Sequence, residues 1–311
     1  MTMLSKVAER TYWFARYLER VENIARLVGV YENLLFDLPR GIDISWYNLI
    51  IINSSRDLFA ERYKVQDERN VVKFLLADDT NPDSMQSSLA MVRENARTTR
   101  DALPPDAWEM INELHLYVRE KIQDGINRTN RRHFLDKVIK RCQQLNGLLN
   151  DNMSKDAGWQ FISLGRNLER ADMTTRLLDA GSAALLNTKM DHQKVDPSQL
   201  IWGNVLRSSG GSTNYRRTMR VAVSGPDVAQ FLITDLFFPR AIAFCIREIE
   251  IAVSGLPGCE LLEVARIKKL IEVQFEDPSQ LGESFREYLN DLQLGLAKLH
   301  VQFSHCWFAP S

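Results

Sequence analysis

The stretch RYLERVENIARL at residues 16–27 decides how the rest of the chain is interpreted, because a second stretch repeats it. Residues 166–177 read RNLERADMTTRL, and the two stretches, here called the signature segments, agree in charge as well as in hydrophobic character. The matched positions are Arg16/Arg166, Leu18/Leu168, Glu19/Glu169, Arg20/Arg170, Glu22/Asp172, Arg26/Arg176 and Leu27/Leu177. A match of this kind indicates internal duplication.

The correspondence continues beyond the signature segments. Trp46 matches Trp202, and an F-L-x-x-D-x-x-x-P block occurs at residues 74–82 and again at 231–239. The offset is 150 residues at the signature segments, 156 at the tryptophans and 157 at the blocks, as small loop insertions would produce. This period predicts two domain-sized halves, residues 1–153 and 154–311, packed together as one unit.

Composition narrows the class of protein. The 311 residues are 45% hydrophobic and 25% charged, with a formal net charge of −1. That balance argues against a nucleic-acid-binding surface along the whole chain, and no apolar run approaches the roughly 20 residues of a membrane helix. The first residues carry charges where a secretion signal would be apolar. Cys142, Cys245, Cys259 and Cys306 form no C-x-x-C pair, which predicts reduced thiols in a cytoplasmic protein.

The hydrophobic periodicity is helical almost throughout. It predicts an all-α fold, a multi-helix bundle built from two duplicated helical halves. The first half is expected to form helices near 4–36, 44–62, 67–77, 83–101, 105–126 and 132–152. The second half is expected to form helices near 156–187, 198–208, 212–222, 226–236, 239–254, 258–275 and 279–306.

A helical wheel separates each signature segment into an apolar stripe and a charged face. The charged positions are Arg16, Glu19, Glu22 and Arg26 in the first segment, and Arg166, Glu169, Asp172 and Arg176 in the second. Three interpretations stay open: a solvated face with weak pairs inside each helix, a buried ion-pair network, or a cleft for a ligand or partner. Agreement between the copies favours the last two, because weak surface pairs exert little pressure to keep charges.

A second basic stripe lies at residues 93–100. Arg93, Arg97 and Arg100 share one helix face, and Glu94 flanks them. Three arginines at this spacing repel one another unless carboxylates of a neighbouring helix or a bound anion neutralise them, and both alternatives are retained. The basic run at residues 128–133 is interpreted as a solvated loop, because no aromatic residues interleave with its charges.

Several familiar chemistries lack their motifs. The sequence has no E-x-x-H pair, no P-loop, no G-x-G-x-x-G and no G-x-S-x-G, so we expect no metal site and no cofactor bound by a motif of this chain. The acidic run at residues 78–83 could suggest a magnesium site. However, Leu236 and Arg240 stand at the positions that match Asp79 and Asp83, so the run is interpreted as a turn between helices.

In these motifs the chain resembles the bacterial alpha-E domain family. The resemblance rests on residues 4–28, 81–112, 162–179 and 228–242. It implies an all-α protein with glutamate–arginine motifs, encoded with or fused to a circularly permuted ATP-grasp protein and often accompanied by a transglutaminase-like protease. It further implies a role in ATP-dependent amide-bond formation or peptide modification, with ATP and magnesium on the partner ligase.

The resemblance also gives the residues expected to bind an anionic small molecule, a peptide or the partner. They are Arg16, Glu19, Glu22, Arg26, Arg93, Glu94, Arg97, Arg166, Glu169, Asp172 and Arg176. Ala241 replaces a serine expected after a Pro-Arg pair, and Asp172 replaces a glutamate. Two other functions are retained: an autonomous enzyme with a glutamate as acid or base, and a non-catalytic interaction scaffold. A homodimer also stays open.

Overall fold

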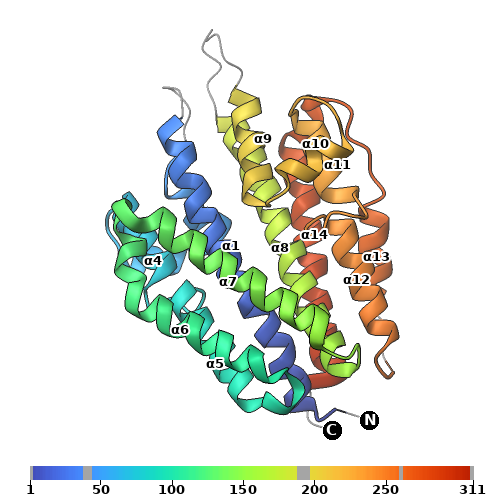
Figure 1. The fold of residues 1–311 in the computed structure, drawn as a ribbon. Helices are drawn as coiled ribbons and strands as arrows, with labels where there is room; N and C mark the ends of the chain where they lie inside the picture. The colour runs from blue at the N-terminus through green and yellow to red at the C-terminus, as the bar shows by residue number, and fades with distance from the viewer. Residues whose placement is uncertain (1–2, 38–43, 188–196, 259–261, 309–311) are drawn as a thin grey trace.

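A computed structural model of the chain describes residues 3–37, 44–187, 197–258 and 262–308 (Figure 1). In these ranges every regular element is helical, which confirms the all-α multi-helix bundle. None of the described helices combines the length and the apolar character that crossing a membrane requires.

The helices of the first half follow the periodicity of the sequence closely. They are α1 (Ser5–Asp37), α2 (Asn48–Ile52), α3 (Arg56–Arg62), α4 (Glu68–Leu76), α5 (Met85–Thr98), α6 (Pro105–Ile126) and α7 (Arg128–Asn152). A single 3₁₀ turn, Arg100–Ala102, lies between α5 and α6.

The second half has the same number of described α-helices. They are α8 (Ala157–Asn187), α9 (Pro197–Ser208), α10 (Ser212–Thr218), α11 (Gly225–Thr234), α12 (Ile242–Ser254), α13 (Leu262–Leu270) and α14 (Glu283–Phe303). A 3₁₀ turn, Pro278–Leu281, precedes α14, and a π-helical turn, Ser304–Phe308, follows it.

Several helix boundaries differ from the prediction by a few residues, and two of the differences have a local cause. The helix expected over residues 44–62 is divided into α2 and α3, because Ser54 adopts a positive φ of 53° that an α-helix cannot contain. The helix expected over residues 83–101 begins at Met85. Ser84 is its N-cap, accepting a hydrogen bond from the Ser87 backbone N–H, while the Asn81 amide donates to the Phe74 carbonyl.

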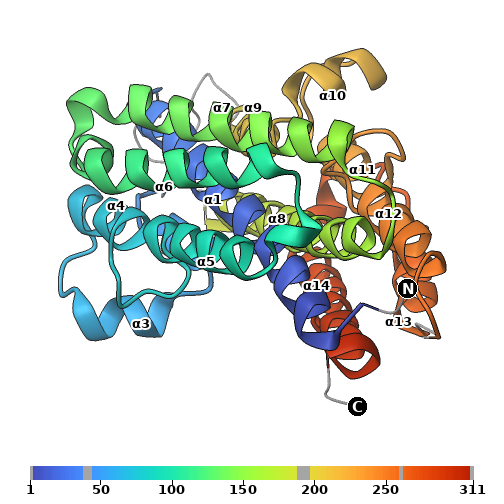
Figure 2. The ribbon, with the colours of Figure 1, turned by 60° about the horizontal axis from the view of Figure 1, so that its bottom comes forward.

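The signature helices α1 and α8 form the centre of the bundle. They make the most extensive contact of any two helices, and both views show them side by side (Figures 1 and 2). Helix α1 also contacts α5 and α7, and α8 correspondingly contacts α12 and α14. Helix α6 packs on α7 as α13 packs on α14. This parallel arrangement is what a duplication predicts, although the duplication itself stays an inference.

Helix α1 is buried on more than its apolar stripe. Leu18, Val21 and Ile24 are at most 2% exposed, as the helical wheel predicts. The carboxyl-bearing residues Glu19 and Glu22 are as deeply buried, at 1% and 2%. A helix surrounded by protein is normally apolar on all sides, so the charged face of α1 must find its partners inside the bundle.

Close approach of α1 and α8 depends on a glycine. A Cβ atom at Gly165 would collide with the backbone carbonyl oxygen of Tyr12 and would lie 3.3 Å from the Ala15 side chain. Because the obstacle is backbone rather than a flexible side chain, a larger residue would have to move the two helices apart.

Replacing this glycine tests the contact between the helices. We expect Gly165→Ala to lower the free energy of unfolding by about 2 kcal/mol, because overpacking must shift one backbone. The matched control is Gly147→Ala in α7, where the added methyl group meets nothing within 4 Å. That control should raise stability by up to about 1 kcal/mol through helix propensity. Urea denaturation of both variants measures the difference, and equal effects would contradict this account of the interface.

Candidate functional site

The charged faces of the signature helices meet each other. Glu169 of α8 lies between two arginines of α1: its Oε2 accepts from Arg16 Nε at 2.7 Å, and its Oε1 accepts from Arg20 Nε at 2.7 Å. The Glu169 side chain is only 5% exposed. A planar guanidinium on each side gives this carboxylate several charge-assisted hydrogen bonds, which is the arrangement that makes a buried charge tolerable.

Glu19 of α1 has the reciprocal environment. Arg170 Nε of α8 lies 3.0 Å from Glu19 Oε2, and Arg240 Nη2 donates to Glu19 Oε1 at 2.7 Å. The same Arg240 nitrogen reaches Glu22 Oε1 at 3.0 Å, which also accepts from Arg26 Nη2 at 2.6 Å. Each glutamate of one half is therefore neutralised by arginines of the other half. The solvated-face interpretation of the segments is wrong for these residues.

We call this cluster the interhelix network. It consists of Arg16, Glu19, Arg20, Glu22, Arg26, Arg166, Glu169, Arg170 and Arg240.

Three members were missing from the residues expected at the site. Arg20 and Arg170 match in the two signature segments, so their agreement was a usable signal. Arg240 lies between α11 and α12, where its carbonyl accepts from Thr174 Oγ1 of α8 at 2.7 Å. In the sequence it stands at the position that matches Asp83, and Asp83 pairs with Arg20. The two matched positions thus both contact α1, with side chains of opposite charge.

Asp172 and Arg176 lie at the edge of the network rather than inside it. They pair within α8, Arg176 Nε donating to Asp172 Oδ2 at 2.8 Å, and both side chains are about a quarter exposed. Arg176 Nη1 also donates to Ser54 Oγ, in the turn between α2 and α3. This pair therefore connects α8 to the first half.

Arg93, Glu94 and Arg97 are not brought to the interhelix network by any described hydrogen bond or ion pair. Arg93 Nε donates to Asn112 Oδ1 of α6 at 2.7 Å. Arg97 forms an exposed pair with Glu94, with Nη2 and Oε1 2.7 Å apart. Arg100, the third arginine of the stripe, stacks over Trp108 at 3.9 Å from the ring centroid. The three arginines of the stripe therefore have three different partners: an amide, a carboxylate and an aromatic ring.

The interpretation of residues 128–133 as a loop is wrong, because they form the start of helix α7, and the expected solvent exposure is wrong for Arg131. This side chain is 1% exposed and donates to the carbonyls of Gly125 and Ile126 at 2.9 Å each. Its Nη1 pairs with Glu68 at 2.7 Å. The guanidinium satisfies carbonyls at the C-terminal end of α6 that have no partner within that helix, a requirement that charge spacing alone does not show.

The network contains more cations than carboxylates. Six arginines face three buried glutamates and Asp83, whose side chain is 49% exposed. Arg166 has no described ion pair, and its Nη2 is buried without a hydrogen-bond partner. The Nε atoms of Arg26 and Arg240 are likewise buried donors without a partner. Buried donors are normally satisfied, so this concentration singles out the network.

Buried Glu19 and Glu169 and the unpaired Arg166 all have lowered pKa values, but the causes differ. Burial alone would raise the pKa of Glu169, but Arg20 and Arg16 lower it to about 2. Arg170 and Arg240 outweigh burial in the same way at Glu19, whose pKa is also about 2. Burial and then Arg170 lower the pKa of Arg166 to about 10. Glutamates held this firmly in the ionised form are poor proton donors at neutral pH, which disfavours an acid–base role for them.

One chain of contacts connects the network to the end of α14. Arg16 Nη1 donates to the Tyr12 hydroxyl at 3.3 Å, and that hydroxyl lies 2.8 Å from His300 Nδ1. Burial and then Arg16 lower the pKa of His300 to about 4. This histidine is therefore neutral at physiological pH and suited to a hydrogen bond with the tyrosine.

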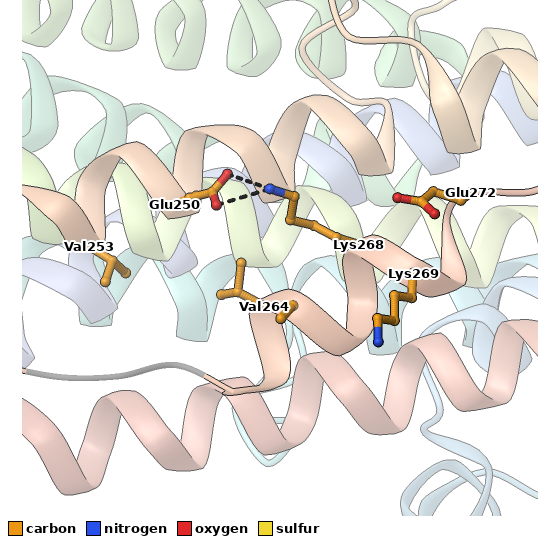
Figure 3. Close-up of a pocket in the computed structure, with 7 residues that line it drawn as sticks. Glu250, Val253, Val264, Lys268, Lys269 and Glu272 are labelled. Atoms are coloured by element: carbon orange, nitrogen blue, oxygen red, sulfur yellow. Dashed lines mark hydrogen bonds and ion pairs between the residues drawn. The ribbon is translucent and has the colours of Figure 1, made fainter.

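The surface cavities described for this fold lie elsewhere. One of about 380 Å³ is located between α12 and α13, where Lys268 Nζ lies 3.0 Å from both carboxylate oxygens of Glu250 (Figure 3). Another, of about 470 Å³, adjoins α10. No signature residue lines either cavity. Among the described residues, no group of three or more His, Cys, Asp or Glu side chains could hold a metal ion.

The cysteines follow the prediction of reduced thiols only in part. Cys142 and Cys245 are free and buried, and burial raises the pKa of the Cys245 thiol to about 12. Cys306 is disulfide-bonded, so the prediction is wrong there. Separation along the chain, on which that prediction rested, does not measure distance in a helical bundle. Cys259 lies outside the described residues.

Comparison with known proteins places this geometry in context. A family model named Alpha-E, described as "a predicted alpha-helical domain with a conserved ER motif", matches residues 3–308. Uncharacterised proteins of Mycobacterium bovis and of two Mycobacterium tuberculosis strains are 22% identical over 275 residues. The match covers 81% of this chain but only 30% of each relative, so the chain spans less than a third of their length. No solved structure matches.

Removing one buried carboxylate tests the energetic role of the network. We expect Glu169→Gln to lower the free energy of unfolding by about 3–5 kcal/mol, because Arg16 and Arg20 would stay buried without their counterion. The control is Glu94→Gln, which removes an exposed carboxylate from a single arginine and should cost far less, because exposed ion pairs contribute little to stability. Chemical denaturation of both variants gives the comparison. Similar losses of the free energy of unfolding in the two variants would show that a buried carboxylate of the network contributes no more than an exposed one.

The pKa shifts predict two pH ranges in which the protein loses stability. The pKa of His300 is about 4 in the folded protein against 6.5 ordinarily, so the unfolded chain binds more protons between these values. Stability should therefore fall as pH drops from about 6.5 to 4, and His300→Gln should flatten that slope. Glu19 and Glu169 should add a second loss as pH falls from about 4.5 towards 2. Urea titrations at graded pH measure both, and a flat wild-type profile would contradict the assignment.

Proposed function

The chain belongs to the Alpha-E family, and from that premise we propose that it is the helical partner or subunit of a circularly permuted ATP-grasp amidoligase system. In this proposal it binds an anionic or peptide substrate during ATP-dependent amide-bond formation or peptide modification. ATP and magnesium would be bound by the ligase, and the helical chain would supply cationic groups to the substrate.

The size of the relatives supports a role within a larger assembly. The matched region makes up 30% of each mycobacterial relative, which leaves most of those polypeptides for other domains. The ligase is the proposed occupant of that remaining length, and a transglutaminase-like protease is a further proposed partner. A second copy of this chain is the third.

The single observation that supports substrate binding is that the interhelix network contains an arginine without a described ion pair. Arg166 has no described ion pair, although its guanidinium carbon lies 5.4 Å from the centroid of the Trp159 ring. An anion that reached Arg166 would gain a charge-assisted hydrogen bond that no protein carboxylate supplies in the described structure. Arginine suits this role because its planar fork matches carboxylate and phosphate groups. A carboxylate is one of the two reactants in amide-bond formation.

Of the two other functions, the geometry disfavours the autonomous enzyme and is compatible with the interaction scaffold. Glutamates whose pKa is about 2 do not suit an autonomous enzyme that needs a carboxyl group as acid or base. The fully paired environment of Glu169 favours a non-catalytic interaction scaffold as the second candidate. The scaffold differs from our proposal in one respect: it gives Arg166 no ligand.

Arg166→Gln distinguishes these candidates. Because the arginine has no described ion pair to lose and burial disfavours its charge, we expect the free energy of unfolding of the isolated chain to fall by no more than about 1 kcal/mol. Together with the ligase, the variant should raise the KM for an acidic peptide substrate about tenfold, because a charge-assisted hydrogen bond is lost. The measurements are chemical denaturation, ADP release and mass spectrometry of the amide product, with triglutamate as the probe.

The matched control is Arg16→Gln in the other signature helix. It removes a paired arginine and should destabilise the chain strongly, since Glu169 loses one of its two partners. Ligase activity that is the same with and without the helical chain would overturn the proposed function. Unchanged kinetics of Arg166→Gln in an active complex would instead favour the scaffold.

A further inference from the structure

A second concentration of unpaired arginines lies on the outer surface, at the C-terminal end of α10. Arg216 and Arg217 belong to the last turn of this helix, and Arg220 follows it. The three side chains and Phe237 contribute to the lining of the cavity of about 470 Å³ that adjoins α10, here called the arginine pocket. Figure 2 shows α10 standing out from one edge of the bundle, where a partner could approach it.

The arginine pocket carries an excess of positive charge, because three arginines and one carboxylate line it. None of its three arginines has a described ion pair; Arg216 Nε only donates to the Ser212 carbonyl at 3.3 Å. The one carboxylate that lines the cavity, Asp235, uses its Oδ1 to accept from two backbone N–H groups, those of Phe237 at 2.8 Å and Phe238 at 2.6 Å. Arginines this close together repel one another unless an anion lies between them.

Apolar side chains flank these cations. Phe237 is 85% exposed, and the neighbouring Leu236 and Val221 are about half exposed. The next aromatic residue behaves in the opposite way: Phe238 is buried and stacks on Phe231 with ring centroids 5.1 Å apart. One phenylalanine therefore anchors the turn, and the other is presented to solvent. Exposed aromatic and arginine side chains together are typical of protein-binding surfaces.

The backbone beside the pocket is held in a defined conformation. Arg220 adopts a φ of 56°, in the left-handed region that residues other than glycine seldom occupy. Buried Tyr215 of α10 spans this turn, its hydroxyl donating to the Ala222 carbonyl at 2.9 Å. A binding surface on a turn fixed in this way loses less conformational entropy when a partner binds.

We propose that the arginine pocket docks an acidic peptide segment of a partner protein, with its carboxylates on Arg216, Arg217 and Arg220 and an apolar side chain against Phe237. The mixture of cations and apolar surface favours this occupant over a bare phosphate, which would leave Phe237 unused. It also favours it over nucleic acid, which needs successive aromatic platforms along a basic groove. The site is separate from the interhelix network and does not depend on the proposed function.

Fluorescence anisotropy with a labelled peptide, Glu-Glu-Leu-Glu-Phe-Glu-Glu, tests the docking site on the full chain. We expect saturable binding that weakens as salt is raised, because screened charges contribute less. The double variant R216E/R217E should weaken binding at least about tenfold, and F237A should weaken it several-fold. The matched control is R128E/R132E, which makes the same change of charge at exposed positions of α7. It should change the affinity by less than about twofold.

Several results would overturn this proposal. Equal binding of a peptide with glutamine in place of every glutamate would exclude recognition of carboxylates. Equal losses in R216E/R217E and R128E/R132E would reduce the effect to overall charge. Tighter binding of single-stranded DNA or of phosphatidylserine vesicles, lost in the same pocket variants, would assign the arginines to a different partner. Circular dichroism of each variant shows that the fold is intact, and no ligase is needed for any of these measurements.

Discussion

Burial of glutamates between arginines across the contact of α1 and α8 is the constraint on which the rest of the structure depends. Glu169 lies between Arg16 and Arg20, and Glu19 lies between Arg170 and Arg240. Removing such charges from water is expensive, and only correctly placed counterions offset the cost. The two central helices therefore have one register in which every buried carboxylate meets a guanidinium. The helices around them pack on a core whose alignment is set by charge as well as by apolar surface.

Much of the fold could be predicted from the sequence, because helical periodicity is a local property. The match between residues 16–27 and 166–177 also singled out the two helices that the structure places at the centre of the bundle. Two local exceptions had causes that periodicity does not contain. Ser54 takes a left-handed conformation and divides a helix, and Arg131 turns inward because the end of α6 exposes carbonyl groups that need donors.

The candidate site could be predicted only in part, because pairing of charges is a relation between helices. The sequence showed which charges agree in the two halves, but not that they face each other. Arg240 illustrates the difficulty: as a mismatch with Asp83 it looked like a departure from the pattern, yet it contacts both Glu19 and Glu22. Arg93 and Arg97 illustrate the reverse, since their regular spacing suggested shared neutralisation by carboxylates of a neighbouring helix or by an anion, and the structure gives them separate partners.

The opposite charges of Asp83 and Arg240 have a consequence for the whole interior. If an aspartate stood at position 240, as it does at the matching position 83, five arginines would face five carboxylates and the centre would be neutral. The arginine that is present instead shifts the balance by two units. A single position thus converts a symmetric, self-compensating core into a polarised one. The two halves are no longer interchangeable, and a molecule assembled from two first halves would lack the charge asymmetry on which the proposed anion binding rests.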